Sequence, residues 1–257
     1  MRISIVTVVR NSVSTIGQCL DSVSGQTCGP VEHIVIDGGS TDGTLEVLRK
    51  RNEISALISE PDHGIYDALN KGVSLATGDV IATLNSDDVY ASNDVLEKVA
   101  AAFERTGCDA LYGDLLFMNR DLTRAIRFWK SGLYDSASFA SGWVPPFPAL
   151  FLKRTVYNRF GLFDSGFQIS GDYEFMLRVL MRHGVSAQYL PEVLVKMRSG
   201  GKSSISFSSL LLRTRENIRA WRMNGYEAGP YTILLKYIRK IPQFSVMLSQ
   251  IRDGQGL

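Results

Sequence analysis

The chain of 257 residues has few cysteines and no long apolar run. Its three cysteines, Cys19, Cys28 and Cys108, are odd in number and fit no metal-binding spacing, so we expect free thiols in a reducing cytoplasm. No stretch of about 18 apolar residues is present, which argues against a transmembrane helix. The apolar run 3–9 is short for a signal peptide, and no small-residue cleavage site follows it. The sequence therefore predicts a cytoplasmic protein.

Two missing glycine patterns narrow the possible functions. No G-x-G-x-x-G follows the first apolar run, which disfavours a dehydrogenase. The next residues, Arg10-Asn11-Ser12, lack the glycines with which a sugar-nucleotide nucleotidyltransferase would grip a triphosphate. Motifs for binding nucleic acid are also missing, so we expect no nucleic-acid partner.

Positive charge gathers near the C-terminal end, although the net charge is only +2. Residues 196–252 carry eleven Lys and Arg against two acidic residues. A helix expected over 231–241 has an apolar stripe formed by Leu234, Tyr237, Ile238 and Ile241. Its basic face is formed by Lys236, Arg239 and Lys240. Such a helix favours peripheral contact with the inner face of a membrane. Packing on the body of the protein or in an oligomer interface fits the pattern equally well.

Short β-branched runs alternate with helical patterns over the first 112 residues. Strands are expected at 3–9, 33–37, 56–58, 80–84 and from 110, with helices at 14–24, 44–51, 66–76 and 93–105. This alternation predicts βαβ units and a mostly parallel sheet. Ligands of such sheets bind beyond the carboxyl ends of the strands.

The pattern is less regular after residue 112. We expect a hairpin or irregular excursion over 115–129, helical segments within 151–160 and 172–183, a strand over 188–195, and final helices at 210–224 and 231–241. The chain thus divides into a domain of residues 1–204 and a basic helical tail of residues 205–257.

Two motifs follow early strands. Asp37 ends the second expected strand and precedes Gly38-Gly39-Ser40. Its carboxylate could accept hydrogen bonds from a ribose or a base while the glycines let the backbone approach a ligand, although an ordinary strand–turn–helix corner looks the same. In the helix expected over 66–76, one face carries Asp67, Asn70 and Lys71. That face suits a ribose and a phosphate, or simply a solvated Asp67–Lys71 pair.

The segment Asn85-Ser86-Asp87-Asp88 comes directly after the fourth expected strand. Adjacent carboxylates repel each other, and a hard divalent cation such as Mg²⁺ or Mn²⁺ would compensate them. That cation could neutralise a diphosphate leaving group. A solvated turn is the alternative, and the position at the end of a strand favours the metal.

Asp172 begins a predicted helix and lies on the same face as Phe175 and Met176, which is expected to be buried. A carboxylate in that place suits a general base that takes a proton from a hydroxyl. Glu174 has Arg178 four residues later, which favours an exposed ion pair.

With these motifs in this order, the sequence resembles the family 2 inverting glycosyltransferases of the GT-A fold. It is similar in particular to bacterial members that assemble exopolysaccharide, capsule or O-antigen units. The resemblance covers residues 1–204, and each motif is weak by itself whereas the ordered set is specific. Two positions depart from the family: Asn85 replaces the first aspartate of the DxD motif, and Gly171 stands where many relatives carry glutamate.

The resemblance implies an α/β protein of GT-A type, with a Rossmann-like, mostly parallel central sheet flanked by helices and a C-terminal helical extension. Residues 1–114 would form the nucleotide-binding half and residues 115–204 the acceptor half. The implied reaction moves a sugar, with inversion, from a nucleotide-sugar to a hydroxyl of a glycan or lipid-linked acceptor. A UDP-sugar is the expected donor. A sugar-nucleotide nucleotidyltransferase and a non-catalytic nucleotide-sugar-binding scaffold are the alternatives.

The resemblance also assigns roles to residues. Asp172 would be the catalytic base, and Asp87 and Asp88 would hold Mg²⁺ or Mn²⁺. The expected donor contacts are Thr7, Val9, Asn11, Asp37, Ser40, Asp62, Tyr66, Asn70, Lys71, Asn85, Ser86, Asp87, Arg198 and Lys202. The last two lie in the segment 198–204, which would be a mobile loop over the donor or a flexible surface turn.

Overall fold

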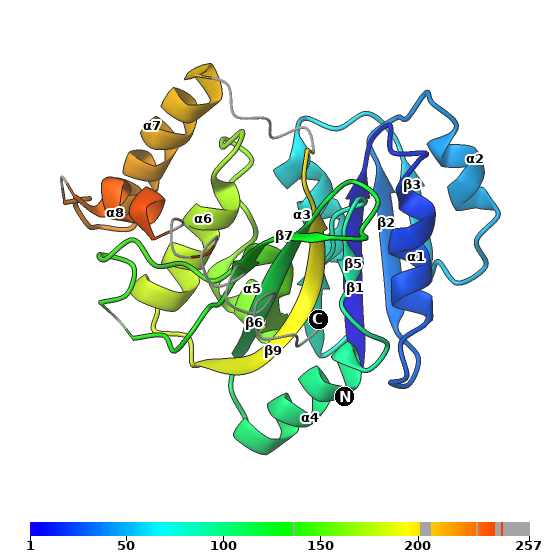
Figure 1. The fold of residues 1–257 in the computed structure, drawn as a ribbon, viewed down its shortest axis with the longest axis horizontal. Coiled ribbons are helices and arrows are strands. Elements are labelled where there is room, and N and C mark those ends of the chain that lie inside the picture. The colour runs from blue at the N-terminus through cyan, green and yellow to red at the C-terminus, as the bar shows by residue number, and fades with distance from the viewer. Residues whose placement is uncertain (136, 201–206, 230, 240–242, 244–257) are drawn as a thin grey trace.

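The structure is a computed structural model that describes residues 1–135, 137–200, 207–229, 231–239 and 243. A nine-stranded sheet forms its centre, with helices on both faces (Figure 1). Lys202, Lys240, Ile241 and the expected boundary at residue 204 lie outside the described residues.

The first half of the chain forms the parallel part of the sheet, as predicted. The strands lie in the order β3-β2-β1-β4, with bounds Ala56–Ser59, Glu32–Asp37, Ile3–Val9 and Val80–Thr83. The helices of this half are α1 (Ile16–Ser24), α2 (Thr44–Arg49), α3 (Ile65–Leu75) and α4 (Val95–Thr106). All three strand pairs are parallel, so their carboxyl ends meet at one edge of the sheet.

The second half of the sheet is mixed. The order continues from β4 through β8 (Leu150–Lys153), β6 (Ala110–Met118) and β9 (Ala187–Arg198) to β5 (Val89–Tyr90), with β7 (Ala125–Trp129) beside β6. Only the β6–β9 pair is parallel in this half, since β8, β7 and β5 pair antiparallel to their neighbours. The expected hairpin over 115–129 is confirmed as β6–β7. Within the expected helical segment 151–160, β8 occupies the first residues and α5 (Arg154–Phe160) the rest.

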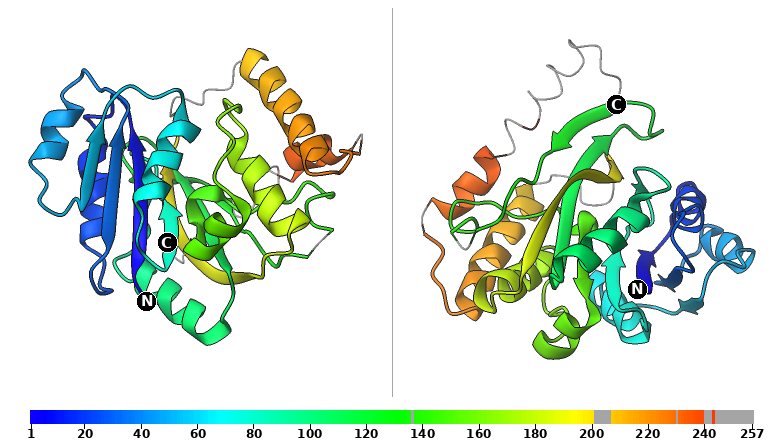
Figure 2. Two further views of the ribbon diagram at one scale, coloured as in Figure 1. Left: turned by 180° about the vertical axis from the view of Figure 1, so that it is seen from behind. Right: turned by 90° about the horizontal axis from the view of Figure 1, so that it is seen from below.

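Two hydrophobic cores lie on opposite faces of the sheet, because successive strand residues point to opposite sides. Val35 and Ile5 contribute to the core under α1, α2 and α4. Val6 and Ile34 contribute to the other core, under α3, α5 and α6 (Gly171–Met176), which continues into the π-helical turn η2 (Leu177–Arg182). A short 3₁₀ turn, η1 (Phe147–Ala149), precedes β8. Figure 2 shows the helices distributed over both faces.

The C-terminal helices α7 (Phe207–Met223) and α8 (Thr232–Ile238) pack on the body beside α6 (Figure 1). Trp221 belongs to the core on that face, and its indole N–H donates to the hydroxyl of Tyr173 at 2.8 Å. None of the helices in the described part of the chain has the length and apolarity needed to cross a bilayer. The three cysteines are free thiols, as expected.

Candidate active site

The loops that follow β1, β2 and β4 are joined by hydrogen bonds at the carboxyl edge of the parallel strands. The backbone N–H of Asn11 donates to Ser40 Oγ at 2.8 Å, and Asn11 Oδ1 accepts the N–H of Thr41 at 2.8 Å. Asn11 adopts a left-handed backbone with a φ of 52°, which asparagine tolerates better than most residues. Ser86 Oγ lies 3.1 Å from Ser12 Oγ. The sequence-predicted residues Asn11, Ser40 and Ser86 therefore come together here.

Asp37 is fully buried at the end of β2. Its carboxylate accepts hydrogen bonds from the backbone N–H and the hydroxyl of Ser40 and, at 2.7 Å, from Ser59 Oγ. The sequence gives no hint of Ser59, because the fold brings β3 beside β2. In this structure, Asp37 therefore shapes the turn that carries Ser40.

Thr7 and Val9 lie on β1 and are both buried. Thr7 Oγ1 hydrogen-bonds His33 Nε2 at 3.0 Å, and the carbonyl of Val9 accepts the N–H of Gly38 at 2.9 Å. The first contact joins the middle of β1 to the start of β2, and the second continues their pairing beyond the carboxyl end of β2.

Asp62 reaches back to the glycine turn after β2. A Cβ on Gly38 would lie only 2.6 Å from Asp62 Oδ2, so a larger residue at position 38 would make the Asp62 carboxylate shift. Asp62 Oδ1 also accepts Lys71 Nζ at 2.9 Å, and the same ammonium pairs with Glu60 and Asp67 at 2.7 and 3.3 Å. The Asp67–Lys71 pair expected from the helical spacing is thus present, within a larger cluster.

Asn70 joins α3 to the segment that follows α5. Its Nδ2 donates to the carbonyl of Phe163 at 2.8 Å, and its Oδ1 accepts the N–H of Phe163 at 2.9 Å. Both ends of the amide are therefore bonded to one backbone residue 93 positions later. This contact links two parts of the chain that are distant in sequence.

The Asn85–Asp88 turn follows β4 at the same edge. Asp88 is fully buried, and its carboxylate accepts Asn85 Nδ2 at 2.7 Å and the N–H of Arg198 at 3.1 Å. Burial and the neighbouring Asp87 charge raise the pKa of Asp88 to about 8. Asp87 itself is only partly buried. Two adjacent carboxylates that repel each other fit the donor set of a divalent cation.

Within the described residues, no three or more His, Cys, Asp or Glu side chains cluster as a metal site. A cation at Asp87 and Asp88 would therefore need further oxygen ligands. The diphosphate of a bound nucleotide and water are the usual source of such ligands for Mg²⁺.

Arg198 connects this turn to two other segments of the chain, at Arg120 and Gln18. Its guanidinium donates to the carbonyl of Asp87 at 2.8 Å, to the carbonyl of Arg120 and to Gln18 Oε1. The side chain is buried, with an exposed fraction of 8%. In this structure, Arg198 thus supports the Asn85–Asp88 turn.

Asp172 lies at the second position of α6, and Tyr66 of α3 contacts it. The Tyr66 hydroxyl lies 2.8 Å from the carbonyl of Ile169 and 3.3 Å from Asp172 Oδ1, which also accepts the N–H of Tyr173 at 2.8 Å. Since α3 begins where β3 has ended, Tyr66 stands at the carboxyl edge of the parallel strands and brings Asp172 there. Burial raises the pKa of Asp172.

Gly171, where the sequence resemblance led us to expect glutamate, lies against the ring of Tyr66. A Cβ on Gly171 would lie 2.8 Å from two ring carbons of Tyr66. A glutamate at this position would displace the ring that contacts Asp172. Gly171 and Tyr66 therefore fit each other.

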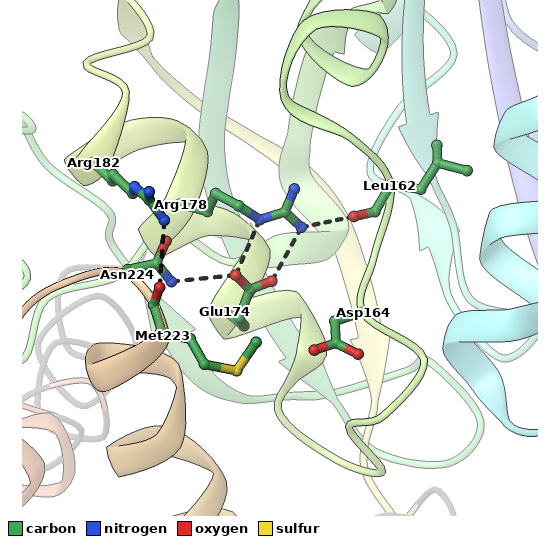
Figure 3. A pocket seen from close by; sticks show the side chains of 7 residues that line it. All are labelled: Leu162, Asp164, Glu174, Arg178, Arg182, Met223 and Asn224. Atoms are coloured by element: carbon green, nitrogen blue, oxygen red, sulfur yellow. Dashed lines mark hydrogen bonds and ion pairs between the residues drawn. The ribbon is translucent and has the colours of Figure 1, made fainter.

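The other face of α6 borders a hollow of about 280 Å³ (Figure 3). Glu174 and Arg178 form the expected i,i+4 pair at 3.0 Å, but the expectation of an exposed pair is wrong, because Glu174 is buried. Arg178 also donates to the carbonyl of Leu162 at 2.6 Å, and Asn224 of the segment after α7 donates to Glu174 at 3.2 Å. Because the charged side chains at this hollow bond to groups of the protein itself, we interpret the hollow as a space left where α6, η2 and α7 pack together.

Comparisons with known proteins agree with this arrangement. The family model of glycosyl transferase family 2 matches residues 4–168, ending just before Asp172. A PGL/p-HBAD biosynthesis glycosyltransferase of Mycobacterium tuberculosis is 30% identical over 203 residues, which cover 77% of either chain. Glycosyltransferase AglE of Haloferax volcanii is 25% identical over 263 residues, which cover 94% of this chain and 86% of AglE.

Two solved structures share the fold at low sequence identity. S. aureus TarS 1–349 in complex with UDP-GlcNAc gives a TM-score of 0.63 at 16% identity, covering 99% of this chain and 93% of that one. Mannosyltransferase PcManGT from Pyrobaculum calidifontis, in complex with GDP-Man and Mn²⁺, gives 0.65 at 17% identity, covering 99% and 76%. With this α/β arrangement and the match over residues 4–168, the chain belongs to glycosyl transferase family 2 and has the GT-A fold.

Proposed function

We propose that this glycosyltransferase moves a sugar, with inversion, from a nucleotide-sugar to a hydroxyl of a glycan or lipid-linked acceptor in bacterial surface polysaccharide synthesis. The observation that carries the proposal is Asp172, a partly buried carboxylate with a raised pKa, held by Tyr66 at the edge where the Asn85–Asp88 turn also lies. A carboxylate with a pKa raised towards neutrality is a better general base than an ordinary aspartate.

The reaction then proceeds in one displacement. Asp172 takes the proton of the acceptor hydroxyl while the hydroxyl oxygen forms a bond to the anomeric carbon. The bond between that carbon and the diphosphate oxygen breaks, and the nucleoside diphosphate leaves from the opposite side. Within the described part of the chain, Tyr66 and the N–H of Tyr173 both donate hydrogen bonds to Asp172 Oδ1. We therefore assign Oδ2 as the oxygen that takes the proton from the acceptor hydroxyl.

The donor occupies the carboxyl edge of β1, β2 and β4 in this proposal. The linked loops of Asn11, Ser40 and Ser86 border the nucleotide, and Asp87 and Asp88 hold a Mg²⁺ or Mn²⁺ ion. When bound, the ion neutralises charge on the departing diphosphate. Arg198 keeps the turn of these aspartates in place. Structures of the same fold are described with UDP-GlcNAc and with GDP-Man and Mn²⁺, which supports a nucleotide-sugar donor.

Calorimetric titration of UDP, GDP and dTDP, each with Mn²⁺ and with a chelator, tests the donor site. We expect one nucleotide, UDP first, to bind with a dependence on Mn²⁺ that Asp87→Ala abolishes. Asp109→Ala, at a partly exposed carboxylate outside this edge, is the matched control and should bind normally. If the folded protein binds none of the three, the donor site is wrong and a scaffold becomes the better hypothesis. Membrane contact and oligomer formation stay predictions from the sequence.

A further inference from the structure

The C-terminal tail places a cation beside the proposed base. Lys236 Nζ lies 3.5 Å from the ring centroid of Tyr173, the residue that follows Asp172. The same ammonium lies 3.4 Å from Asn217 Oδ1 on α7. An ammonium over an aromatic face is held by the negative charge of the ring face. Lys236 thus has a defined position next to α6, although 64 residues separate it from Asp172 in the sequence.

The backbone of α8 is held closely against the body. A Cβ on Gly142 would lie 2.3 Å from the backbone nitrogen of Lys236, so the loop around Gly142 touches the helix directly. Arg239 donates to the carbonyl and the hydroxyl of Ser141, both at 2.8 Å. These contacts fix the orientation of α8 and therefore determine which of its side chains face the body of the protein. The apolar residues Leu234 and Ile238 lie on the exposed side, with exposed fractions of 52% and 45%, and Lys236 on the packed side.

The neighbouring helix α7 holds the start of α6. Glu216 is buried, and its carboxylate accepts the N–H groups of Gln168, Ile169 and Ser170 at 2.7, 3.0 and 2.8 Å. These N–H groups precede Gly171 and would otherwise lack partners inside the protein. Both tail helices therefore contact the turn of α6 that carries Asp172.

We propose that Lys236 is a positioning residue of the transfer reaction: its ammonium, fixed on the Tyr173 ring, keeps the Asp172 carboxylate ionised and ready to take a proton. The inference rests on the proposed role of Asp172. Besides burial, the pKa of Asp172 responds to the ammonium of Lys236 on α8, the backbone N–H of Tyr173, the hydroxyl of Tyr66 on α3 and the guanidinium of Arg213 on α7. Burial raises the pKa of Asp172, and Lys236 is the strongest influence that opposes the rise. Lys236 therefore counteracts the desolvation that the site imposes on its base.

Titration of the Asp172 carboxyl carbon by NMR tests this inference without any substrate. The protein is labelled with ¹³C at its aspartate carboxyl groups. The signal of Asp172 is identified by comparison with the Asp172→Asn variant, in which that signal is missing. We expect Lys236→Met to move the midpoint of this signal to higher pH and Lys236→Arg to restore it. Arg222→Met removes a charge at an exposed position of α7, and this control should leave the midpoint in place.

The pH dependence of kcat/KM gives the second readout. The acidic limb should move upward in Lys236→Met, and each unit of movement lowers activity below the midpoint about tenfold. A merely structural role would lower activity at every pH.

If Lys236→Met does not fold, Lys236→Gln carries the same test, since its amide can still contact Asn217. If a folded Lys236→Met or Lys236→Gln variant has the same Asp172 titration midpoint as the native protein, the inference is wrong. If instead the native protein transfers no sugar, the proposed function fails, while the carboxyl titration still decides whether Lys236 acts on Asp172.

Discussion

Burial of His33 keeps its imidazole ring uncharged and makes the stability of the protein depend on pH. The ring lies on β2 with an exposed fraction of 1%, hydrogen-bonds Thr7, and has a pKa lowered by burial to about 4. In the unfolded chain, it gains a proton near its ordinary pKa of 6.5. Between pH 6.5 and 4, the unfolded state therefore binds more protons, and stability falls as the pH falls.

Replacing His33 with glutamine should remove this sensitivity to acid. The amide can still hydrogen-bond Thr7, but it has no proton to gain. Relative to the variant, we expect the native protein to lose about 3 kcal/mol of unfolding free energy between pH 6.5 and 4. Urea denaturation at several pH values measures the difference. His63→Gln, at an exposed position, is the control. Parallel pH profiles of native protein and His33→Gln would refute the explanation.

Single residues also show where sequence reasoning reached its limit. The sequence marks polar side chains at strand ends, because a strand buried on both faces makes a following Asp or Asn conspicuous. Sequence alone does not show that Asn70 bonds to Phe163 or that Asp37 bonds to Ser59. Those partners are 93 and 22 residues away, and only the folded chain brings them together.

Among the elements, α7 has the clearest structural task. Glu216 provides a carboxylate for three N–H groups at the start of α6, and hydrogen bonds to a charged acceptor are the strong ones. Glu216→Gln replaces one oxygen by an amide donor, which opposes at least one of these N–H groups whichever way the amide is turned.

We expect Glu216→Gln to lower the free energy of unfolding by about 2–4 kcal/mol. Chemical denaturation measures the change. Glu227→Gln alters the second acidic residue of the tail, which is exposed, and should change stability by less than about 0.5 kcal/mol. Equal effects of the two substitutions would show that α7 is not held through Glu216.

The elements differ in how well their sequence pattern predicts them. The strands β1, β2 and β4 are continuous apolar runs, and their parallel order follows from the helices between them. The strands β5 and β8 give no periodic signal, so their antiparallel pairs with β9, β4 and β6 went unpredicted, whereas the β6–β7 hairpin was expected. The amphipathic pattern of α8 does not reveal which face packs, and in the structure Lys236 faces the body while Leu234 is exposed.

Across the domain, the active site joins parts that are distant in sequence. Loops after β1, β2 and β4 form the proposed donor side, Tyr66 bridges to Asp172, and α7 and α8 hold the helix of Asp172. The resemblance stops at residue 204, so the role of the tail became visible only in the fold. The described part of the tail therefore packs against the helix that carries Asp172.

Sugar transfer by Asp172→Asn tests the account most directly. The substitution keeps the size of the side chain and an oxygen for the N–H of Tyr173, but it removes the basic carboxylate. With the donor identified by calorimetry, we predict unchanged donor affinity and a transfer rate lower by about 10²–10⁴-fold. A variant that transfers sugar at the native rate, with the donor bound normally, would contradict the assignment of Asp172 as the base.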